Sequence, residues 1–342
     1  MRTGIVKDSR FADHTLGPDH VESPERIIVL NRLAEDEFRD SVRHIEPRAA
    51  SDRELEFIHS PDYIRLIRST AGRERTPLDP DTSASPLSWE TARLAAGGTI
   101  EAALLILEGR VRNGLALVRP PGHHAEAAAA KGFCLFNNIA LAAESLIRDH
   151  GLKRILIVDW DLHHGNGTQH SFSDRKDVLY FSSHQFPHYP GTGDFNEVGT
   201  GKGEGFTVNA PFPAGFGDAE YIEVYSRILR PIALQYRPEL VLVSAGFDPY
   251  VKDPLGGMEV TGSGFGNLMS IIREIADETC KGKVLLTLEG GYNPDGLREG
   301  VQSVLHALTG PRWNVPTLGA PKAERVIQTI ISHHKKYWKG LK

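Results

Sequence analysis

The stretch that decides the fold is "RILIVDWDLHHGNGTQ", residues 154–169. Its uninterrupted aliphatic run, residues 155–158, is typical of a strand buried on both faces in a parallel sheet covered by helices. Two aspartates and two histidines then follow within six residues, 159–164. Because burying a bare carboxylate is very costly, such groups are normally paired, hydrogen-bonded or bound to a metal. The stretch therefore predicts a buried strand that ends in a polar site.

The rest of the chain repeats this alternation of short apolar runs with longer amphipathic stretches. The expected strands are residues 4–7, 114–119, 154–160, 178–182, 240–245 and 284–289, and the expected helices are residues 88–108, 138–150, 218–236, 263–281 and 294–308. Such a β-α-β pattern predicts an open parallel sheet between helices.

Length and composition are those of an ordinary globular protein. With 342 residues, 40% of them hydrophobic and 24% charged, the chain can bury a full core. The Pro- and Ser-rich stretch 77–88 is short, and there is no internal repeat, so one domain over residues 1–342 is expected. The net charge of -5, with both signs interspersed, does not indicate nucleic acid as a partner. The basic stretch 333–336 is expected to be a solvated helix end.

Cysteine usage and hydropathy indicate the compartment. Cys134 and Cys280 are too few for a disulfide framework and fit a reducing environment. Residues 1–10 lack the apolar segment of a signal peptide, and no apolar run is long enough to span a membrane. A cytoplasmic location without a membrane partner is expected.

Polar residues follow four of the expected strands. They lie in "RPPGHH" (119–124), in "DWDLHH" (159–164), in "SAGFD" (244–248) and in "EGGYN" (289–293). In open parallel sheets, ligands bind beyond the carboxyl ends of the strands. These segments are therefore expected to meet at one edge of the sheet and to form a site.

The residue types at this edge suit a metal ion. Since extended residues alternate between faces, Asp159, Asp161 and His163 would point the same way. Asp161 and His163 could supply two ligands and Asp248 a third, which is the pattern of a catalytic zinc site with an open position. Taken singly, each residue is more often a helix cap or a surface histidine. However, eight of the fifteen histidines fall between His123 and His188, which independent caps do not explain.

Hydrolysis at such a metal also needs acid–base groups. Zinc lowers the pKa of bound water to about 7, but a base and later an acid are still required. His123 and His124 follow a sharp Pro-Pro-Gly turn and could serve, although two structural histidines bonded to backbone carbonyls remain an alternative. Tyr292, after the Gly290-Gly291 hinge, could donate a hydrogen bond to a developing oxyanion.

Seven segments together resemble the histone deacetylase superfamily, most closely its class II members and their bacterial amidohydrolase relatives. They are "RPPGHHAE" (119–126), "GFCLFNNIALAA" (132–143), "VDWDLHHGNGTQ" (158–169), "PGTGD" (190–194), "SAGFD" (244–248), "DPLGG" (253–257) and "EGGYN" (289–293). The resemblance implies an arginase/deacetylase-type α/β/α fold with an eight-stranded parallel sheet. The segment "HVESPER" (20–26) also resembles the family and is expected at the rim or in support of the site.

The resemblance also implies a role for each matching residue. It makes Asp161, His163 and Asp248 the ligands of one Zn²⁺, with Fe²⁺ as the other candidate metal. His124 would be the general base and then the acid, with His123 as its electrostatic and hydrogen-bonding partner. Tyr292 would polarise the scissile carbonyl.

The remaining implied roles concern a second cation and the substrate channel. Asp159 would hydrogen-bond His123. A structural K⁺ would be held by the Asp159 carboxylate, the backbone carbonyls of Asp161, His163 and Ser183, and the hydroxyl of Ser182. A second monovalent site would lie near Phe172 and Val178. Phe133 and Tyr189 match the walls of an acyl-lysine tunnel that is also lined by Gly132, Gly291 and Leu255.

Three positions bear on the substrate. Asn166 stands where class I members carry an Asp behind the base, which is the class II pattern. Tyr189 replaces a usual Phe and adds a hydroxyl to the tunnel. Leu255 stands where polyamine-selective relatives carry a gatekeeping Glu, so acyl-lysine is favoured over a cationic polyamine.

The leading hypothesis is therefore a zinc amidohydrolase that removes acetyl or a short acyl group from lysine. The alternative within the family is an acetylpolyamine amidohydrolase. A binuclear manganese ureohydrolase is disfavoured because residue 165 is Gly rather than a metal ligand, and a binding module without turnover is disfavoured because His124 and Tyr292 are present. Association into a homo-oligomer, with the loop 187–205 as a candidate contact, is a further expectation.

Overall fold

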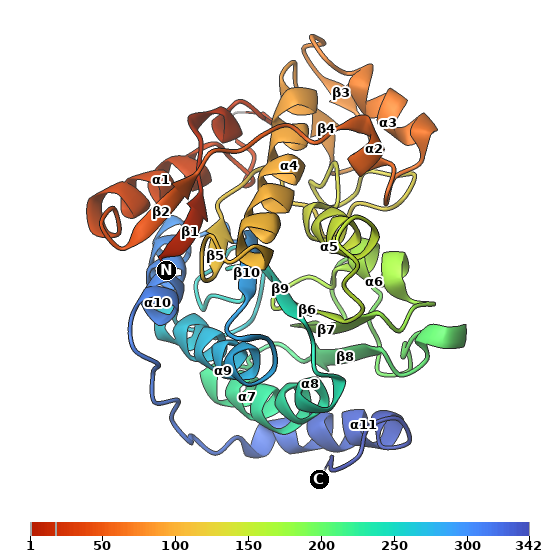
Figure 1. Ribbon diagram of the computed structural model, residues 1–342, viewed down its shortest axis with the longest axis vertical. Helices are drawn as coiled ribbons and strands as arrows, with labels where there is room; N and C mark the ends of the chain where they lie inside the picture. The colour runs from red at the N-terminus through yellow and green to blue at the C-terminus, as the bar shows by residue number, and fades with distance from the viewer. Residues whose placement is uncertain (1, 18, 342) are drawn as a thin grey trace. The chain divides into compact units, whose positions relative to one another are not determined.

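The computed structural model describes residues 2–17 and 19–341 of the chain (Figure 1). Eight strands form one sheet in the order β2-β1-β5-β10-β9-β6-β7-β8. In chain order they are β1 Thr3–Val6, β2 Val42–Ile45, β5 Gly114–Ala116, β6 Ile155–Asp159, β7 Val178–Gln185, β8 Thr207–Phe212, β9 Leu240–Ala245 and β10 Val284–Leu288, and a separate antiparallel pair is β3 Thr76–Pro77 with β4 Ser83–Ala84. The sheet predicted from the apolar runs is confirmed.

The helices alternate with these strands as the pattern predicted. They are α1 Glu25–Glu37, α2 Asp52–Leu55, α3 Pro61–Arg68, α4 Ser88–Leu107, α5 Asn138–Arg148, α6 Asn166–Phe172, α7 Asp218–Val224, α8 Arg230–Tyr236, α9 Gly262–Cys280, α10 Pro294–Thr309 and α11 Glu324–His334.

The described chain forms two compact units. Unit 1 comprises the described residues up to Leu152 with Gly165–Ser171 and Leu285–Gly290, and unit 2 comprises Lys153–His164, Phe172–Val284 and the described residues from Gly291 onward. Within each unit, neighbouring strands of the eight-stranded sheet run parallel. The expectation of a single domain over residues 1–342 stays a prediction.

Unit 1 is built around the strands β2, β1, β5 and β10. Helix α4 packs against β1, β5 and α5 (Figure 1). A Cβ atom at Gly97 of α4 would lie 2.1 Å from the backbone oxygen of Arg48, so this close approach of helix and loop requires glycine.

Unit 2 is built around β9, β6, β7 and β8. All five residues of β6 are buried, which explains its uninterrupted apolar sequence. In the register of these strands, Asp159 at the end of β6 lies opposite Ser182 of β7 and Ser244 of β9. Helix α9 packs against α7, α8 and α10 (Figure 1). The parallel register thus sends the segments after β6 and β9 out from the same edge of unit 2.

The helix predicted over residues 218–236 is interrupted by a π-helical turn at Tyr225–Leu229. Within this turn the N–H of Arg230 donates to the carbonyl of Tyr225, five residues earlier. Pro231 follows directly and has no N–H to continue an α-helical pattern, which gives a physical reason for the irregular turn.

Several elements were absent from the prediction, namely β2, β3, β4, β8, α1, α2, α3 and α6, and of α11 only a helix end at residues 333–336 was expected. Strand β8 contains Asn209 and Pro211, which speak against a central strand. It is the last strand in the sheet order, where a missing ladder donor is tolerated.

The expectation of a solvated basic end at residues 333–336 is wrong for His334. Lys335 and Lys336 are exposed, but the His334 side chain is buried at the end of α11. Because burial disfavours the charged imidazolium, the pKa of His334 falls to about 4. Helix α11 packs on β8, and His334 belongs to the buried face of the helix while the two lysines lie in water.

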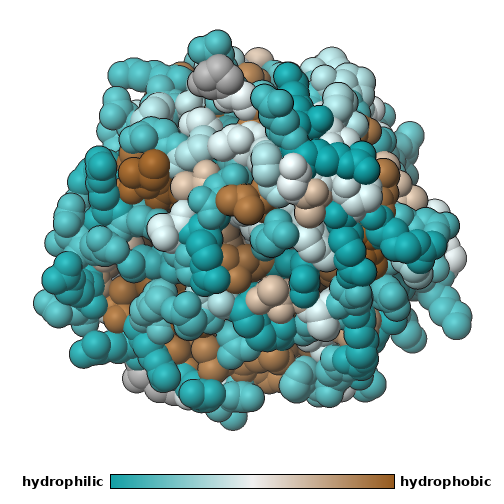
Figure 2. All heavy atoms as spheres, turned by 90° about the horizontal axis from the view of Figure 1, so that it is seen from above, coloured by the Kyte–Doolittle hydropathy of each residue, from teal (hydrophilic) through white to brown (hydrophobic). Residues whose placement is uncertain are grey.

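The surface fits the composition. The face drawn in Figure 2 is mainly hydrophilic, with hydrophobic side chains in small groups. No helix among the described residues has both the length and the apolar character needed to cross a bilayer.

Candidate metal centre and active site

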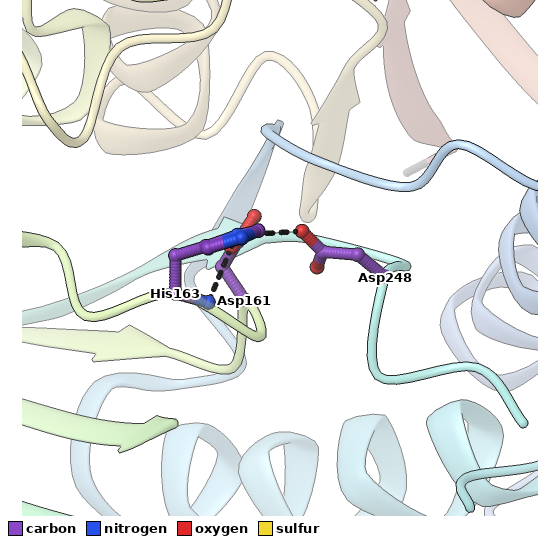
Figure 3. Close-up of side chains that lie close together, drawn as sticks. All are labelled: Asp161, His163 and Asp248. Carbon is purple, nitrogen blue, oxygen red and sulfur yellow. Dashed lines mark hydrogen bonds and ion pairs between the residues drawn. The ribbon is translucent and has the colours of Figure 1, made fainter. Parts of the chain in front are cut away.

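Three buried side chains of unit 2 converge on one point (Figure 3). Asp161 and His163 lie on the segment that follows β6, and Asp248 lies just beyond β9. The Nδ1 atom of His163 is 3.1 Å from Asp161 Oδ1 and 3.1 Å from Asp248 Oδ2. One potential ligand atom from each residue lies within 4.8 Å of the others. The structure therefore brings together the three residues that the sequence suggested as ligands.

The charges at this point call for a cation. Burial lowers the pKa of His163, but hydrogen bonds and charge from Asp161 and Asp248 outweigh burial and raise it to about 10. Burial and then the negative charge of Asp161 raise the pKa of Asp248 to about 7. Two carboxylates thus lie together at one buried site, and a nearby positive charge would stabilise their ionised forms. A divalent ion would meet this demand, and two carboxylate oxygens with one imidazole nitrogen suit Zn²⁺.

The backbone orients the two carboxylates. The N–H of His163 donates to Asp161 Oδ1 over 2.8 Å, and the N–H of Leu162 donates to Asp248 Oδ1 over 2.9 Å. A Cβ atom at Gly246 would lie 2.1 Å from Asp161 Oδ2, so the glycine of "SAGFD" leaves room for the ligand carboxylate.

Asp159 and Ser182, two of the expected K⁺ ligands, lie side by side in adjacent strands. Asp159 is fully buried and accepts hydrogen bonds from the Tyr180 hydroxyl over 3.0 Å and from the Asp161 N–H over 3.1 Å. His184 Nε2 lies 2.9 Å from the carbonyl of Gly193, so it carries the proton, and Nδ1 accepts from the Ser182 hydroxyl.

This arrangement leaves the Ser182 oxygen able to act as a ligand, since its proton is directed to His184. The carbonyls expected to complete the K⁺ site, including that of Ser183, and the site near Phe172 and Val178 stay predictions.

The rim of unit 2 carries further aromatic residues. The expected tunnel residue Tyr189 is 37% exposed, and its ring centroid lies 6.2 Å from that of His163. The His188 ring lies nearer, at 5.2 Å from the His163 ring. His188 was missed as a site residue, although it lies in the histidine-rich region that suggested a site.

In unit 1, His123 and His124 are both buried and their ring centroids lie 4.0 Å apart. His124 Nδ1 is 2.7 Å from Asn166 Oδ1. The Asn166 amide nitrogen donates to the carbonyl of His124 over 3.3 Å and to Glu126 over 2.5 Å, which fixes the orientation of the amide. His124 Nδ1 must then carry the proton, and Nε2 carries the lone pair that a general base needs.

Glu126 was quoted within "RPPGHHAE" but received no role from the sequence. It accepts hydrogen bonds from Asn166 and from His170 Nδ1, the latter over 2.9 Å. Although burial opposes ionisation, hydrogen bonds from His170 and Asn166 lower the pKa of Glu126. The negative charge of Glu126 is therefore in direct contact with Asn166, on the side chain that also bonds to His124.

Gly132, one of the expected tunnel residues, lies beside His124, and the tunnel roles of Gly132 and Phe133 stay predictions. A Cβ atom at Gly132 would lie 2.2 Å from His124 Cδ2, and the backbone φ of 53° there also favours glycine. The Phe133 N–H donates to Thr82 Oγ1 over 3.0 Å, and the His20 ring meets the Phe133 ring edge-on at 4.8 Å. Thr82 was missed because it lies in a loop that matched no motif.

A buried ion network supports the turn before His123. Arg119 donates to Glu22 over 2.5 and 2.7 Å, and Arg26 donates to the same glutamate over 3.0 Å. Arg26 also donates to the backbone carbonyl of Glu289 over 2.6 Å. The segment 20–26 therefore takes the supporting role of the two that its sequence suggested.

Glu289 fastens the turn itself. It is fully buried, and its Oε2 atom accepts the N–H groups of Gly122 over 2.6 Å and of His123 over 3.1 Å. No role for Glu289 could be predicted, since its partners lie more than 160 residues away in the sequence.

We expect Glu289→Ala to lower the free energy of unfolding by about 2–6 kcal/mol, because two buried N–H groups lose their acceptor at about 1–3 kcal/mol each. Chemical denaturation measures this change. Glu289→Gln is the matched control, since one amide oxygen can still accept both hydrogen bonds. Equal stability of Glu289→Ala and wild type would contradict the proposed role of this carboxylate.

Unit 2 contains three more of the expected site residues, Tyr292, Gly291 and Leu255. Two of them bond through their backbone to the carboxylate of Asp253. The N–H of Tyr292 donates to Asp253 Oδ2 over 2.7 Å, and the N–H of Leu255 donates to Asp253 Oδ1 over 3.0 Å. Tyr292 and Leu255 are half-buried. Asp253 was quoted in "DPLGG" but received no role from the sequence.

The comparisons with known proteins agree with these observations. The profile of a family described as "Histone deacetylase domain" matches residues 20–308. The crystal structure of the HDA15 HD domain superposes with a TM-score of 0.92 at 36% identity, covering 99% of this chain and 97% of that one.

Similar sequences carry deacetylase names. "Polyamine deacetylase HDAC10" of Homo sapiens is 41% identical over 94% of this chain and 50% of its own length, and "Histone deacetylase HDA1" of Candida albicans is 38% identical over 100% of this chain and 45% of its own. This chain thus spans about half the length of those two relatives. "Probable deacetylase" of Archaeoglobus fulgidus is 36% identical over 100% of both chains.

Proposed function

Because this chain belongs to the histone deacetylase family, we propose that it hydrolyses the amide bond of acetyl-lysine or of lysine bearing a related short acyl group. The observation that carries the proposal is the buried convergence of Asp161, His163 and Asp248. A buried site with two carboxylates and one imidazole favours a divalent cation, and three protein ligands leave a position for substrate.

We assign the metal site to one Zn²⁺. Bound there, zinc would supply Lewis acidity, which activates water and the amide carbonyl for hydrolysis. Two adjacent Mn²⁺ ions, as a ureohydrolase needs, would require further ligands. Among residues 2–17 and 19–341, this trio is the one cluster of three or more His, Cys, Asp or Glu side chains close enough together to hold a metal ion, and residue 165 is Gly.

His124 acts as the base and then as the acid in this proposal. With Nδ1 protonated toward Asn166, Nε2 can take a proton from water and later return it to the leaving amine. The His123 ring lies 4.0 Å from the His124 ring and is proposed to act as its electrostatic partner when His124 is protonated. The side-chain amide bonded to His124 Nδ1, in place of a backbone carbonyl, supports this role for His124 over a purely structural one.

Tyr292 is the proposed donor to the developing oxyanion. A single such hydrogen bond is worth roughly 10²- to 10³-fold in rate at comparable sites. That the histidine pair of unit 1 and the ligands of unit 2 serve one reaction is part of the proposal. It rests on the sequence, where each group follows a strand of a parallel sheet.

The acyl-lysine side chain is proposed to pass Gly132, Phe133, Tyr189, Leu255 and Gly291. One K⁺ held by Asp159, Asp161, His163, Ser182 and Ser183 would balance the buried charge below the metal. A hydroxamate, which chelates zinc through two oxygens, should inhibit. The cytoplasmic location and the association into a homo-oligomer stay predictions.

An acetylated polyamine is the second candidate substrate, favoured by the similarity to the human protein named polyamine deacetylase. Leu255 argues against it, because an uncharged mouth residue gives a polycation no specific attraction. The experiment is kcat/KM on an acyl-lysine peptide panel and on N-acetylputrescine, measured with metal-reconstituted enzyme. A large preference for N-acetylputrescine would replace lysine with polyamine in the proposal.

We expect Leu255→Glu to raise kcat/KM for N-acetylputrescine relative to an acetyl-lysine peptide on the order of tenfold. The reason is that a half-buried carboxylate at the mouth attracts the distal ammonium group of the polyamine. Leu255→Gln is the matched control, since it adds polarity and no charge. An unchanged ratio in Leu255→Glu would remove Leu255 from the substrate channel.

A further inference from the structure

The segment that carries Tyr292 has little regular structure of its own to hold it. Strand β10 ends at Leu288 and helix α10 begins at Pro294. Within this connection Gly291 has a φ of 114°, a conformation that favours glycine. As a glycine, it also has no side chain that could pack against the core. A hydroxyl that must meet an oxyanion within a few tenths of an ångström therefore needs an anchor from elsewhere.

Asp253 provides such an anchor. Its Oδ2 atom accepts two consecutive backbone N–H groups, from Tyr292 over 2.7 Å and from Asn293 over 3.2 Å. Hydrogen bonds to an ionised carboxylate are about twice as strong as neutral ones. The Asn293 side chain in turn accepts from the N–H of Gly296 over 2.9 Å and caps α10. The anchor thus continues into a long helix.

The other carboxylate oxygen of Asp253 bonds to the loop around Leu255, called the mouth loop because Leu255 is expected at the mouth of the substrate channel. Asp253 Oδ1 accepts the N–H of Leu255 over 3.0 Å, and the N–H of Asp253 donates to the carbonyl of Tyr250 over 2.8 Å. The Asn293 amide also donates to the carbonyl of Lys252 over 3.0 Å, which ties the two segments a second time. One carboxylate therefore fixes the backbone at both Tyr292 and Leu255.

We propose that Asp253 is a positioning residue that sets the place of the Tyr292 hydroxyl and couples it to the mouth loop at Leu255. The inference rests on the proposed function of Tyr292. Asp253 is 6% exposed, so its oxygens depend on these protein partners rather than on bulk water.

The variant Asp253→Asn tests this inference. An asparagine has one acceptor oxygen and one NH₂ group, and the NH₂ group repels whichever backbone N–H it faces. One side of Asp253 then loses its acceptor, and the backbone N–H groups on the other side bond to a neutral amide oxygen in place of a carboxylate, which is about half as strong. Because a misplacement of about 1 Å can cost roughly 10²-fold in rate, kcat should fall about 10- to 100-fold. Zinc content should be unchanged, since Asp161, His163 and Asp248 are intact.

A double-mutant cycle separates positioning from a general structural effect. In the Tyr292→Phe background, Asp253→Asn should lower kcat by less than about twofold, because the hydroxyl it positions is already gone. An equal loss in both backgrounds would overturn the inference.

Hydrogen exchange gives a readout that does not depend on turnover. In Asp253→Asn, amide exchange over residues 289–296 should become faster. Asp218→Asn is the matched control, because Asp218 also clamps a backbone N–H and a side chain, those of Thr261 over 2.9 and 2.7 Å. This control should speed exchange near Thr261 and leave kcat unchanged.

The outcomes distinguish the two claims. Unchanged exchange at residues 289–296 in Asp253→Asn would overturn the anchor, whatever the activity. Wild-type enzyme that binds zinc but cleaves no acylated amine, with faster exchange in Asp253→Asn, would contradict the proposed function and support the anchor.

Discussion

Asp248→Ala is expected to lose the metal and, with it, the activity. Asp248 is fully buried and supplies one of three converging ligand atoms. Removing one partner from a buried charged cluster typically costs about 3–5 kcal/mol, so zinc affinity should fall on the order of 10³-fold. Metal content after dialysis against a weak chelator, measured by mass spectrometry, should drop from about one zinc per chain to nearly none.

An exposed ion pair provides the control for this variant. Asp149 pairs with Arg53 at the surface over 2.6 Å, and Asp149→Ala should retain zinc and activity because such pairs contribute little. Retention of a full zinc equivalent at wild-type affinity by Asp248→Ala would remove this residue from the site. Reconstitution with Fe²⁺ in place of Zn²⁺ should show the same dependence on Asp248.

His124→Ala is expected to keep the metal but to lose most of the activity. Its imidazole supplies the base and the acid of the proposed reaction, and general acid–base catalysis contributes roughly 10²- to 10⁴-fold. We therefore expect kcat to fall by that factor, while zinc content and hydroxamate affinity stay within a few-fold of wild type. Steady-state kinetics and a zinc assay on the same preparation make the measurement.

His44→Ala is the matched control, because His44 is an exposed histidine in unit 1, with Nε2 2.9 Å from the Lys7 carbonyl and Nδ1 4.0 Å from Glu46 Oε2. It should leave kcat unchanged. If His124→Ala kept wild-type kcat with its zinc in place, the structural reading of this histidine would be preferred. A parallel loss of zinc in His124→Ala would instead mean that the variant had disturbed the metal centre.

The fold was largely predictable because its signal is local. A run such as residues 155–158 can be buried on both faces only in a strand covered by helices, and β6 forms there. Strand β8 was missed because Asn209 and Pro211 interrupt its apolar run. The π-helical turn at Tyr225–Leu229 was missed because its surroundings keep the amphipathic period of a helix. Local rules predicted elements well where one pattern dominated and failed where two competed.

The ligand set was also predictable, although Asp248 lies far along the chain from Asp161. Parallel strands send their carboxyl ends to the same edge, so polar residues after β6 and β9 could be expected to meet. The sequence alone therefore determined the sheet, its polar edge, and the identity of Asp161, His163 and Asp248 as candidate ligands.

Only the tertiary structure decided which groups hold the reactive residues in place. Glu289 on the backbone of Gly122, Glu126 on the side chain of Asn166, and Asp253 on the backbone of Tyr292 all lie in quoted motifs, but no pattern in the sequence predicted their partners. The physical reason is the nature of the partner. Glu289 and Asp253 bind backbone N–H groups, which are the same at almost every residue, and Glu126 binds side chains that the fold brings from about 40 positions further along the chain. The sequence pattern therefore predicted where the reactive residues lie, and tertiary packing decided which carboxylates hold them in place.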